Sequence, residues 1–407
     1  MKNLTLAVLF FLVLSVFLVF TKEKIGDVRP ALLPPKSSIG ENPSFPLDLP
    51  EGFKIGIFAP SASFGQAKDK SSGQATLGAV RDLEFSPGGT LLVSIPADGK
   101  VVALPDKNED GVADEVRDIV TGLSRPHGLA FHQGKLFIAQ EPRVVRYNWD
   151  EENLKATEDR VLFALPKGGR HFTRTVSFNQ KGQMFVSVGS SCDVCFEKHP
   201  WLGSVIVSDA EGNNPRIWAK GLRNSVFITV NPQTDQLWGT EMGRDFLGDD
   251  LPPDEVNIIR ESRDYGWPVC YGNRVYDEQF GQETQEYCKD TEPPVYEIPA
   301  HSAPLGLTFI DSPQFPGSWQ GDLLVAYHGS WNRSTPIGYK VVRLDVEGEA
   351  LHQTVQGEED FISGFLPSSA SGLAQAYGRP VDLIFDKAGS LYISDDKAGI
   401  IYKVIRP

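Results

Sequence analysis

The stretch VRDLEFSPGGTLLVS, residues 80–94, decides the fold because its pattern recurs along the chain. An apolar run ends in an aromatic residue, a short turn follows, and a second run of small and apolar residues completes the unit. Two strands joined by a tight turn produce this pattern, so it predicts a β-hairpin. The later copies are PHGLAFHQGKLFIAQ (126–140), RTVSFNQKGQMFVSVG (174–189), SVFITVNPQTDQLWGTE (225–241), PLGLTFIDSPQFPGSWQGDLLVAY (304–327) and PVDLIFDKAGSLYISDD (380–396).

The spacing of these copies indicates how the hairpins are assembled. The residues that precede the turns are Phe85, Phe131, Phe178, Val230, Phe309 and Phe385. The first three intervals are 46, 47 and 52 residues, near the ~40–50 typical of one propeller blade, and the last two are one blade plus an insertion. The sequence therefore predicts an all-β, six-bladed β-propeller with four-stranded blades. A pair of β-sandwiches, the alternative, would not repeat one hairpin signature six times.

Composition narrows the possible partners. The chain has 407 residues, 41% of them hydrophobic, which is enough for a large core. Its 53 acidic and 39 basic residues give a net charge of −14. Because phosphate backbones require a positive surface, nucleic acid is not expected as a partner.

The N-terminal region predicts export. Positions 4–20 are uncharged and apolar, and only bulky residues follow where a cleavage site would need small ones. We therefore expect residues 1–25 to be a signal or membrane anchor in a hydrophobic helix, left uncleaved. Residues 26–48 are a Pro-rich linker, and residues 49–407 are the propeller. This arrangement predicts a periplasmic or extracytoplasmic, membrane-anchored protein.

The four cysteines form two locally close pairs, Cys192 with Cys195 and Cys270 with Cys288. Outside the cytoplasm, two disulfides explain them best. A zinc site is the alternative for SCDVC, but the second pair lacks the matching short spacing. Phe196 stands where covalent haem attachment would need histidine.

Polar residues stand just before the first strand of several repeat units. These are His127, His171, Arg223 with Asn224, His301, and Arg379 with Asp382. Equivalent positions of successive blades meet at one mouth of the channel, so we expect a ring of polar and cationic groups there, completed by Lys340. Such a ring would suit a small ligand with several negative charges. Salt bridges between blades are the alternative role for these cations.

Two acidic loops raise the question of cation binding. MGRDFLGDDLPPDEVN, residues 242–257, holds five carboxylates, which solvation, a bound cation or cationic side chains placed opposite would explain. In the second loop, Asp106, Asn108, Asp110 and Asp114 occupy positions 1, 3, 5 and 9 of a calcium loop with Gly111 at position 6. Position 12 is Arg117 instead of glutamate, so a surface turn is an equal alternative to a calcium site.

Five segments together carry a resemblance to a known family. They are RNSVFITVNPQTDQLWGTEMGRDFLGDDLPPDEVN (223–257), DYGWPVCYG (264–272), AHSAPLGLTF (300–309), AYHGSWNRSTPIGYKVVR (326–343) and GRPVDLIF (378–385). From about Leu49 to the C-terminus, the chain resembles the soluble quinoprotein glucose and sorbosone dehydrogenases, and is most similar to the sorbosone dehydrogenase-like branch. The resemblance implies a six-bladed propeller that binds pyrroloquinoline quinone (PQQ), a tricarboxylate, and Ca²⁺ at the channel mouth. Such proteins oxidise sugars and pass electrons to an external acceptor.

The resemblance also implies roles for individual residues. His171 matches the general base, and Arg223 with Asn224 matches the Arg-Asn pair at the cofactor. The backbone carbonyls of Gly243 and Arg244 match calcium ligands. Lys340, Arg379 and Asp382 match polar groups around the quinone, and Trp331 is expected as an apolar wall over cofactor or sugar, with core packing as its alternative.

Two positions depart from the glucose-oxidising members. Arg170 replaces an acidic residue before the base, and Met242-Gly243-Arg244 is bulkier than their calcium loop.

The resulting prediction is a PQQ- and calcium-dependent dehydrogenase that oxidises an aldose or sorbosone-like sugar. Electrons would leave to a separate cytochrome or quinone. Two other classes stay open on sequence grounds. One is a noncatalytic propeller that binds carbohydrate or protein, and the other is a calcium-dependent lactonase-like hydrolase with a ring of carboxylates in its channel.

Overall fold

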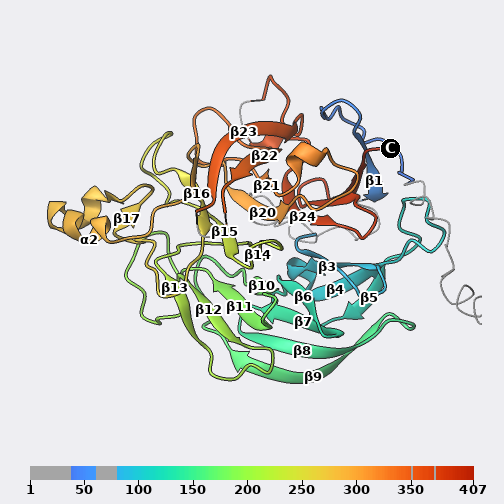
Figure 1. Cartoon of the computed structure of the whole chain (residues 1–407), viewed down its shortest axis with the longest axis horizontal. Coiled ribbons are helices and arrows are strands. Elements are labelled where there is room, and N and C mark those ends of the chain that lie inside the picture. The colour runs from blue at the N-terminus through green and yellow to red at the C-terminus, as the bar shows by residue number, and fades with distance from the viewer. Residues whose placement is uncertain (1–37, 61–79, 350–351, 371–372) are drawn as a thin grey trace, which may run out of the picture. The chain divides into compact units, whose positions relative to one another are not determined.

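The computed structural model describes residues 38–60, 80–349, 352–370 and 373–407. Within these residues, six four-stranded antiparallel sheets follow one another along the chain (Figure 1). The innermost strand of each sheet contacts the innermost strands of its two neighbours, so the sheets form a closed ring. The predicted all-β, six-bladed propeller is confirmed.

Blades 1 to 3 are each built from four consecutive strands. Blade 1 contains β2 (Leu83–Phe85), β3 (Leu91–Ile95), β4 (Lys100–Leu104) and β5 (Arg117–Val120). Blade 2 contains β6 (Leu129–His132), β7 (Lys135–Gln140), β8 (Arg143–Asp150) and β9 (Lys155–Ala164). Blade 3 contains β10 (Val176–Phe178), β11 (Gln183–Val188), β12 (Ser204–Asp209) and β13 (Arg216–Lys220).

Blades 4 to 6 carry the insertion and the closure of the ring. Blade 4 contains β14 (Ile228–Val230), β15 (Leu237–Glu241), β16 (Asp254–Ile258) and β19 (Tyr296–Ile298). Blade 5 contains β20 (Pro304–Phe309), β21 (Leu323–Tyr327), β22 (Lys340–Glu347) and β23 (Thr354–Ile362). Blade 6 contains β24 (Pro380–Phe385), β25 (Leu391–Asp395), β26 (Ile400–Ile405) and, from the other end of the propeller, β1 (Lys54–Ala59).

The ring closes through the pairing of β1 with β26. The two strands are antiparallel, with Lys54 opposite Ile405 and Ile57 opposite Tyr402. The Phe58 side chain then packs edge-on against Tyr392, with ring centroids 5.0 Å apart. Without β1, blade 6 would have three strands and the backbone edge of β26 would be unpaired.

Hydrophobic packing lies between the blades. Every residue of β3, β15, β21 and β25 is buried, because these strands have a neighbouring blade on each face. This explains why β3 (LLVSI) and β21 (LLVAY) are nearly continuous apolar runs. Each pair of adjacent blades shares one cluster of buried apolar side chains, including the pair formed by blades 1 and 6.

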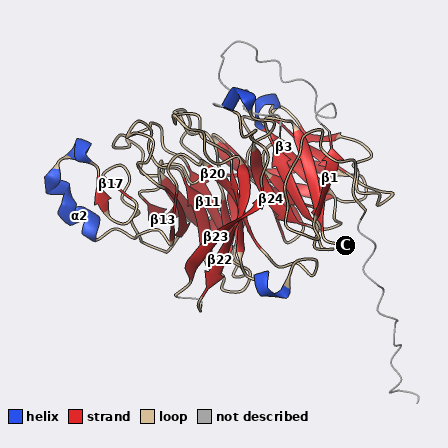
Figure 2. Ribbon diagram, turned by 90° about the horizontal axis from the view of Figure 1, so that it is seen from above, coloured by secondary structure: helices blue, strands red, loops and turns tan. Residues whose placement is uncertain are grey.

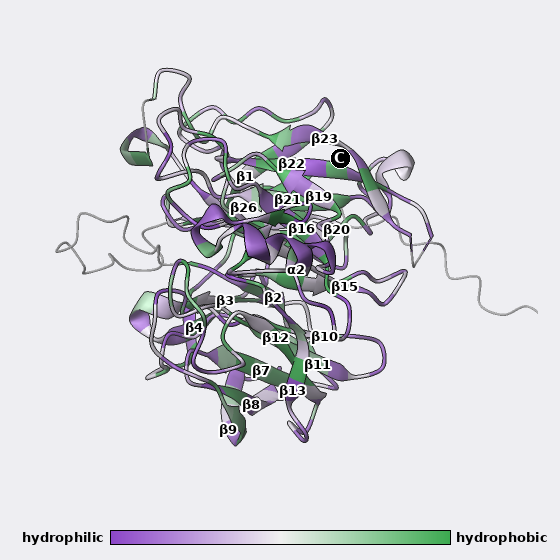
Figure 3. Cartoon of the chain, turned by 90° about the vertical axis from the view of Figure 1, so that its left-hand side faces the viewer, coloured by the Kyte–Doolittle hydropathy of each residue, from purple (hydrophilic) through white to green (hydrophobic). Residues whose placement is uncertain are grey.

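The long insertion of blade 4 lies between β16 and β19. It holds the hairpin of β17 (Cys270–Tyr271) and β18 (Val275–Tyr276), the 3₁₀ turns η3 (Glu278–Phe280) and η4 (Gln282–Thr284), and α2 (Gln285–Lys289). It projects from the edge of the ring (Figures 1 and 2), and α2 is hydrophilic (Figure 3). Among the described residues, the other 3₁₀ turns are η2 (Pro96–Asp98), η5 (Gly317–Trp319) and η6 (Leu373–Gln375).

Both predicted disulfides are present, Cys192–Cys195 and Cys270–Cys288. The second bridge ties α2 to β17 across the insertion. Since all four sulfurs are used, the zinc alternative is wrong.

Residues 38–48, the described part of the predicted linker, contact the propeller. Asp48 forms a β-bridge with Ser363, and the Phe45 ring stacks on Tyr377 with centroids 5.1 Å apart. Apolar side chains therefore hold this segment against the blades, which a free tether would not show. The predicted anchor at 4–20 lies outside the described residues, and among those described no helix is long and apolar enough to span a membrane.

We expect Phe58→Ala to destabilise the whole propeller because it opens a cavity at the seam of the ring. A buried Phe→Ala change costs about 3–5 kcal/mol in the free energy of unfolding. Urea unfolding should show this loss as one cooperative shift. Lys54→Ala, on the exposed face of the same strand, is the control and should stay within about 0.5 kcal/mol of the parent. Equal stability of Phe58→Ala and Lys54→Ala would contradict the role of β1 in closure.

Candidate active site

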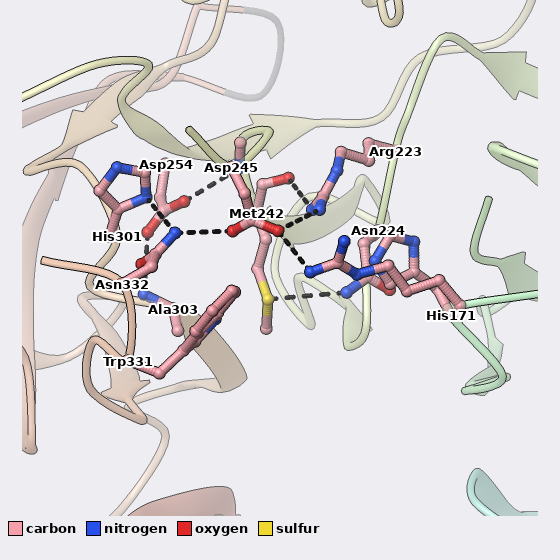
Figure 4. A pocket seen from close by; sticks show the side chains of 12 residues that line it. His171, Arg223, Asn224, Met242, Asp245, Asp254, His301, Ala303, Trp331 and Asn332 are labelled. Carbon is pink, nitrogen blue, oxygen red and sulfur yellow. Dashed lines mark hydrogen bonds and ion pairs between the residues drawn. The ribbon is translucent and has the colours of Figure 1, made fainter. Parts of the chain in front are cut away.

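A cavity of about 230 Å³ lies where loops of blades 3, 4 and 5 converge (Figure 4). Its residues come from the segments that precede β10, β14 and β20, from those that follow β15 and β21, and from the start of β16. They are Arg170, His171, Arg223, Asn224, Met242, Gly243, Asp245, Asp254, His301, Ala303, Trp331 and Asn332. The sequence therefore brings together His171, Arg223, Asn224, His301, Trp331 and Gly243, as predicted for the channel mouth.

His171 has one ring nitrogen fixed and one free. Its Nδ1 lies 2.8 Å from Ser190 Oγ, and Ser190 Oγ donates to the carbonyl of Cys192 over 2.7 Å. Because the serine hydroxyl has only one proton, it accepts from Nδ1–H of His171, which leaves Nε2 unprotonated. Burial, reinforced by Arg223 and Arg170, lowers the pKa of His171 to about 2. A neutral imidazole with a free Nε2 is the form that a general base requires.

His301, unlike His171, has no free ring nitrogen. Its Nε2 lies 2.8 Å from the carbonyl of Gly248, to which it donates. Its Nδ1 lies 3.5 Å from the amide nitrogen of Asn332. Both nitrogens of His301 are therefore occupied, so the cavity contains one histidine that is ready to accept a proton.

Arg223 is buried, with 4% of its surface exposed, and all three guanidinium nitrogens have partners. Nε donates to the Asp193 carbonyl over 3.0 Å, and Nη1 donates to the Met242 carbonyl over 3.2 Å. Nη2 forms ion pairs with Asp193 at 2.7 Å and Asp245 at 3.4 Å. Such a network fixes the guanidinium at one position on the cavity wall.

Asp245 joins the two sides of the cavity (Figure 4). Its carboxylate accepts from Arg170 at 2.7 Å and from the Asn332 amide at 2.7 Å, in addition to the pair with Arg223. Burial raises the pKa of Asp245, and Arg223 opposes that shift. Sequence reasoning placed this residue in the acidic loop but assigned it no contact, because its partners lie far away in the chain.

Cationic side chains opposite the acidic loop explain its charge. Arg333 Nη2 pairs with Asp250 at 2.9 Å, and Arg333 Nη1 bonds to the carbonyls of Asp249 and Ala300. Asp254 instead accepts backbone N–H groups of Gly243 and Ala303, at 2.9 and 2.8 Å. Burial raises the pKa of Asp254 to about 7.

Asn224 lines the cavity and has a side-chain oxygen without a partner. Its Oδ1 is buried and has no hydrogen-bond partner, whereas its Nδ2 contacts the Met242 sulfur at 3.6 Å. A buried acceptor without a donor is costly unless a ligand or ion satisfies it. This oxygen is therefore a candidate ligand for a cation.

Two aromatic side chains border the cavity opening. Trp331 is 55% exposed and Phe246 is 71% exposed, and their rings meet edge to face with centroids 6.1 Å apart. The Arg170 guanidinium lies 6.0 Å from the centre of the Trp331 ring. Trp331 thus lies at the rim and not in a core, as the wall role requires.

Other predicted residues lie outside the cavity lining. Lys340 pairs with Glu358 and Asp360 on the outer strands of blade 5. Arg379 donates to the carbonyls of His328 and Gly329 at 2.9 and 2.6 Å, beneath the loop that carries Trp331. Arg244 turns its side chain to Asp277 at 2.6 Å. These three cations are used in local contacts.

The remaining predicted residues also lie apart from the cavity. Asp382 faces the central channel, where it accepts from the backbone of Leu83 at 2.7 Å. His127 is fully buried and packs against Phe227 with ring centroids 5.0 Å apart. The ring of polar groups expected at the mouth is thus concentrated on blades 3 to 5.

The loop with Asp106, Asn108, Asp110 and Asp114 forms a hydrogen-bonded turn. Asp106 accepts the backbone N–H groups of Asp110 and Gly111 at 3.1 and 3.0 Å. Among the described residues, the one group of three or more acidic, His or Cys side chains close enough to share a metal is Cys192, Cys195 and Glu197. Its sulfurs are joined to each other, so it is not a metal site. Calcium binding by the 106–114 loop stays a prediction.

Comparison with known proteins identifies the family of this chain and several relatives. Residues 70–407 match the TrAA12-like family. An uncharacterized protein of Borreliella burgdorferi is 30% identical over 373 residues, covering 88% of this chain and 90% of that protein. The PQQ-dependent pyranose dehydrogenase of Coprinopsis cinerea is 25% identical over 389 residues, covering 80% of this chain and 52% of the relative, so the chain spans about half its length.

A solved structure has the same fold. The holo form of the PQQ domain of the Coprinopsis cinerea pyranose dehydrogenase superposes with a TM-score of 0.74 at 21% identity, covering 89% of this chain and 98% of that domain. The chain belongs to the TrAA12-like family. The predicted relationship to PQQ-dependent sugar dehydrogenases, which are oxidoreductases, is confirmed at the level of the family.

The low pKa of His171 predicts a specific loss of stability in acid. The unfolded histidine binds a proton near pH 6.5 and the folded one does not, so the free energy of unfolding falls as pH drops below that value. The slope from one such group is about 1.4 kcal/mol per pH unit. Urea unfolding at pH 7 and 4.5 should show a smaller acid-induced loss for His171→Gln than for the parent. Identical losses would mean that His171 titrates normally in the folded chain.

Proposed function

We propose that the chain is a PQQ- and calcium-dependent dehydrogenase that oxidises an aldose or related sugar and passes electrons to an external acceptor. The observation that carries this proposal is the free Nε2 of neutral His171, on the same cavity wall as the buried Arg223. His171 can remove a proton from a sugar hydroxyl, and Arg223 can stabilise the negative charge that develops on the hydroxyl oxygen. The family relationship supplies the class of substrate and cofactor.

The charges around the cavity fit an anionic quinone only if a cation binds with it. Arg170 pairs with Asp245, and Arg223 pairs with Asp193 and Asp245, so the two positive charges are largely balanced by the protein itself. PQQ carries three carboxylates, and adding it alone would leave an excess of negative charge in a partly buried site. A divalent cation beside it would restore the balance, and Ca²⁺ prefers the oxygen ligands that are present here.

The residues that would hold the two groups can be named from their contacts. The unpartnered Oδ1 of Asn224 and the backbone carbonyl of Gly243 are the oxygens we assign to Ca²⁺. Arg223 and Arg170 would face the carboxylates of the quinone, and Trp331 would cover one face of the cofactor or sugar. When bound, PQQ supplies the acceptor for hydride, with calcium polarising it.

This chain's own residues would prepare the substrate for that transfer. His171 Nε2 accepts the hydroxyl proton, and Ser190 keeps Nδ1–H engaged so that the ring cannot rotate away. The aromatic pair of Trp331 and Phe246 at the opening limits the access of water. Arg170, which replaces the acidic residue of glucose-oxidising members, contacts Asp245 and Trp331 instead of His171.

We infer that the protein works outside the cytoplasm, attached through its N-terminal segment, and that a cytochrome or quinone removes the electrons. Two disulfides support an oxidising compartment.

The hydrolase alternative would use the carboxylates of Asp82, Glu84 and Asp382 in the central channel. Each of them accepts a backbone N–H, at 2.9, 3.3 and 2.7 Å, so these carboxylates already have a structural use.

Reconstitution tests the proposed function. Purified protein with PQQ and Ca²⁺ should bind the quinone with a stoichiometric absorbance change and reduce an electron-accepting dye in the presence of aldoses, pyranoses or sorbosone. His171→Ala should lower turnover by about 10²–10⁴-fold, the usual contribution of a general base, while quinone binding persists. His352→Ala, at an exposed position, is the matched control. Absence of quinone binding at saturating Ca²⁺ would favour the noncatalytic alternative.

Calcium binding can be tested without quinone or sugar. Because an ion that binds only the folded state stabilises it, Ca²⁺ at 100 times its Kd should add about 2.7 kcal/mol to the free energy of unfolding. Asn224→Ala should remove most of this gain. Asn108→Ala, in the second acidic loop, should leave it intact, and the reverse pattern would move the calcium site to residues 106–114.

A further inference from the structure

A four-residue loop closed by a disulfide lies beside the cavity without lining it. Cys192, Asp193, Val194 and Cys195 follow β11, and the bridge joins residues whose Cα atoms are 6.2 Å apart. The proposed function assigns this loop no role. Its carbonyl oxygens nevertheless accept hydrogen bonds from Arg223 and from Ser190, the partner of His171.

Asp193 contacts Arg223 twice. Its carbonyl accepts from Nε at 3.0 Å, and its carboxylate accepts from Nη2 at 2.7 Å. The same carboxylate accepts the backbone N–H of Asp245 at 3.0 Å, and the carbonyl also accepts from the indole of Trp267 at 3.1 Å. One residue therefore fixes the guanidinium and the start of the acidic segment that lies over it.

Cys192 acts on His171 through Ser190. The Cys192 carbonyl takes the only hydroxyl proton of Ser190, at 2.7 Å, so Ser190 Oγ is left as an acceptor for Nδ1–H of His171 at 2.8 Å. Ser190 is fully buried, which leaves water no route to replace either bond. The position of one backbone carbonyl thus selects the imidazole tautomer.

We propose that the disulfide-closed loop Cys192–Cys195 is the positioning element of the site. Asp193 orients Arg223, and the Cys192 carbonyl, through Ser190, holds His171 with Nδ1 protonated and Nε2 free. The bridge restricts a short loop that would otherwise have several conformations. This inference rests on the proposed function for its catalytic meaning, but its structural content can be measured in the protein without cofactor.

The first experiment examines the tautomer of His171 by ¹⁵N NMR of the imidazole rings in the cofactor-free protein, with His171→Gln to assign the signals. The parent should show Nδ1 protonated and Nε2 unprotonated. Cys192→Ser/Cys195→Ser should convert this single form into a mixture of tautomers. Cys270→Ser/Cys288→Ser is the matched control and should keep the parent pattern. A single Nδ1-protonated form in Cys192→Ser/Cys195→Ser would overturn the proposal.

Asp193 provides a second test of the positioning role. This test is decisive if circular dichroism shows that Cys192→Ser/Cys195→Ser does not fold. In Asp193→Ala, the Arg223 Nε–H resonance of the cofactor-free protein should broaden or shift. Dye-linked kcat should fall by about 100-fold, as for a misplaced catalytic group, with a smaller change in sugar KM. Asp193→Asn keeps an acceptor oxygen and should recover most of both. An unchanged Arg223 resonance in Asp193→Ala would overturn the proposal.

The positioning role of the loop and the proposed dehydrogenase function can fail separately. If the parent shows the expected tautomer and Arg223 resonance, and both change in the variants, the positioning role stands even when no sugar is oxidised. In that outcome only the proposed dehydrogenase function is lost.

Discussion

The pairing of the first described strand with the last is the constraint on which the molecule depends. A propeller blade is apolar on both faces, so each blade is stable only between two others, and the ring must close. Here β1 completes blade 6 beside β26, and the Phe85–Tyr392 contact joins blade 1 to blade 6. With the ring closed, loops that lie far apart in sequence are held at fixed distances. The cavity on blades 3 to 5 is a product of that geometry.

Charge pairing is the second organising feature, and it acts locally. Two guanidinium groups, of Arg170 and Arg223, share the buried Asp245, while Arg223 also binds Asp193. Removing one partner from such a set would strand a buried charge, which costs about 3–5 kcal/mol. Cationic side chains therefore hold part of the acidic segment 242–257. Arg170 and Arg223 pair with Asp245, and Arg333 pairs with Asp250.

The hairpin repeat was sufficient to predict the propeller, because one signature at a nearly constant interval has few structural explanations. The same repeat placed His171, Arg223, Asn224 and His301 at one mouth. It could not distinguish cations that face the cavity from those used elsewhere, since Lys340 and Arg379 find their partners only in the folded chain. Asp245, Ser190 and Asp193 were missed for a similar reason. Asp245 and Asp193 take partners from other blades, and Ser190 joins His171 to Cys192 between two loops of blade 3. The local sequence contains no signal for these contacts.

Trp331 is the one tryptophan of the seven that is exposed, and it stands at the edge of the cavity. The others are buried or partly buried, and none of them lines the cavity. The intrinsic fluorescence of the unlabelled chain therefore contains a component that is sensitive to what occupies the opening. The indole works as a built-in optical probe, and its emission allows occupancy to be followed separately from turnover.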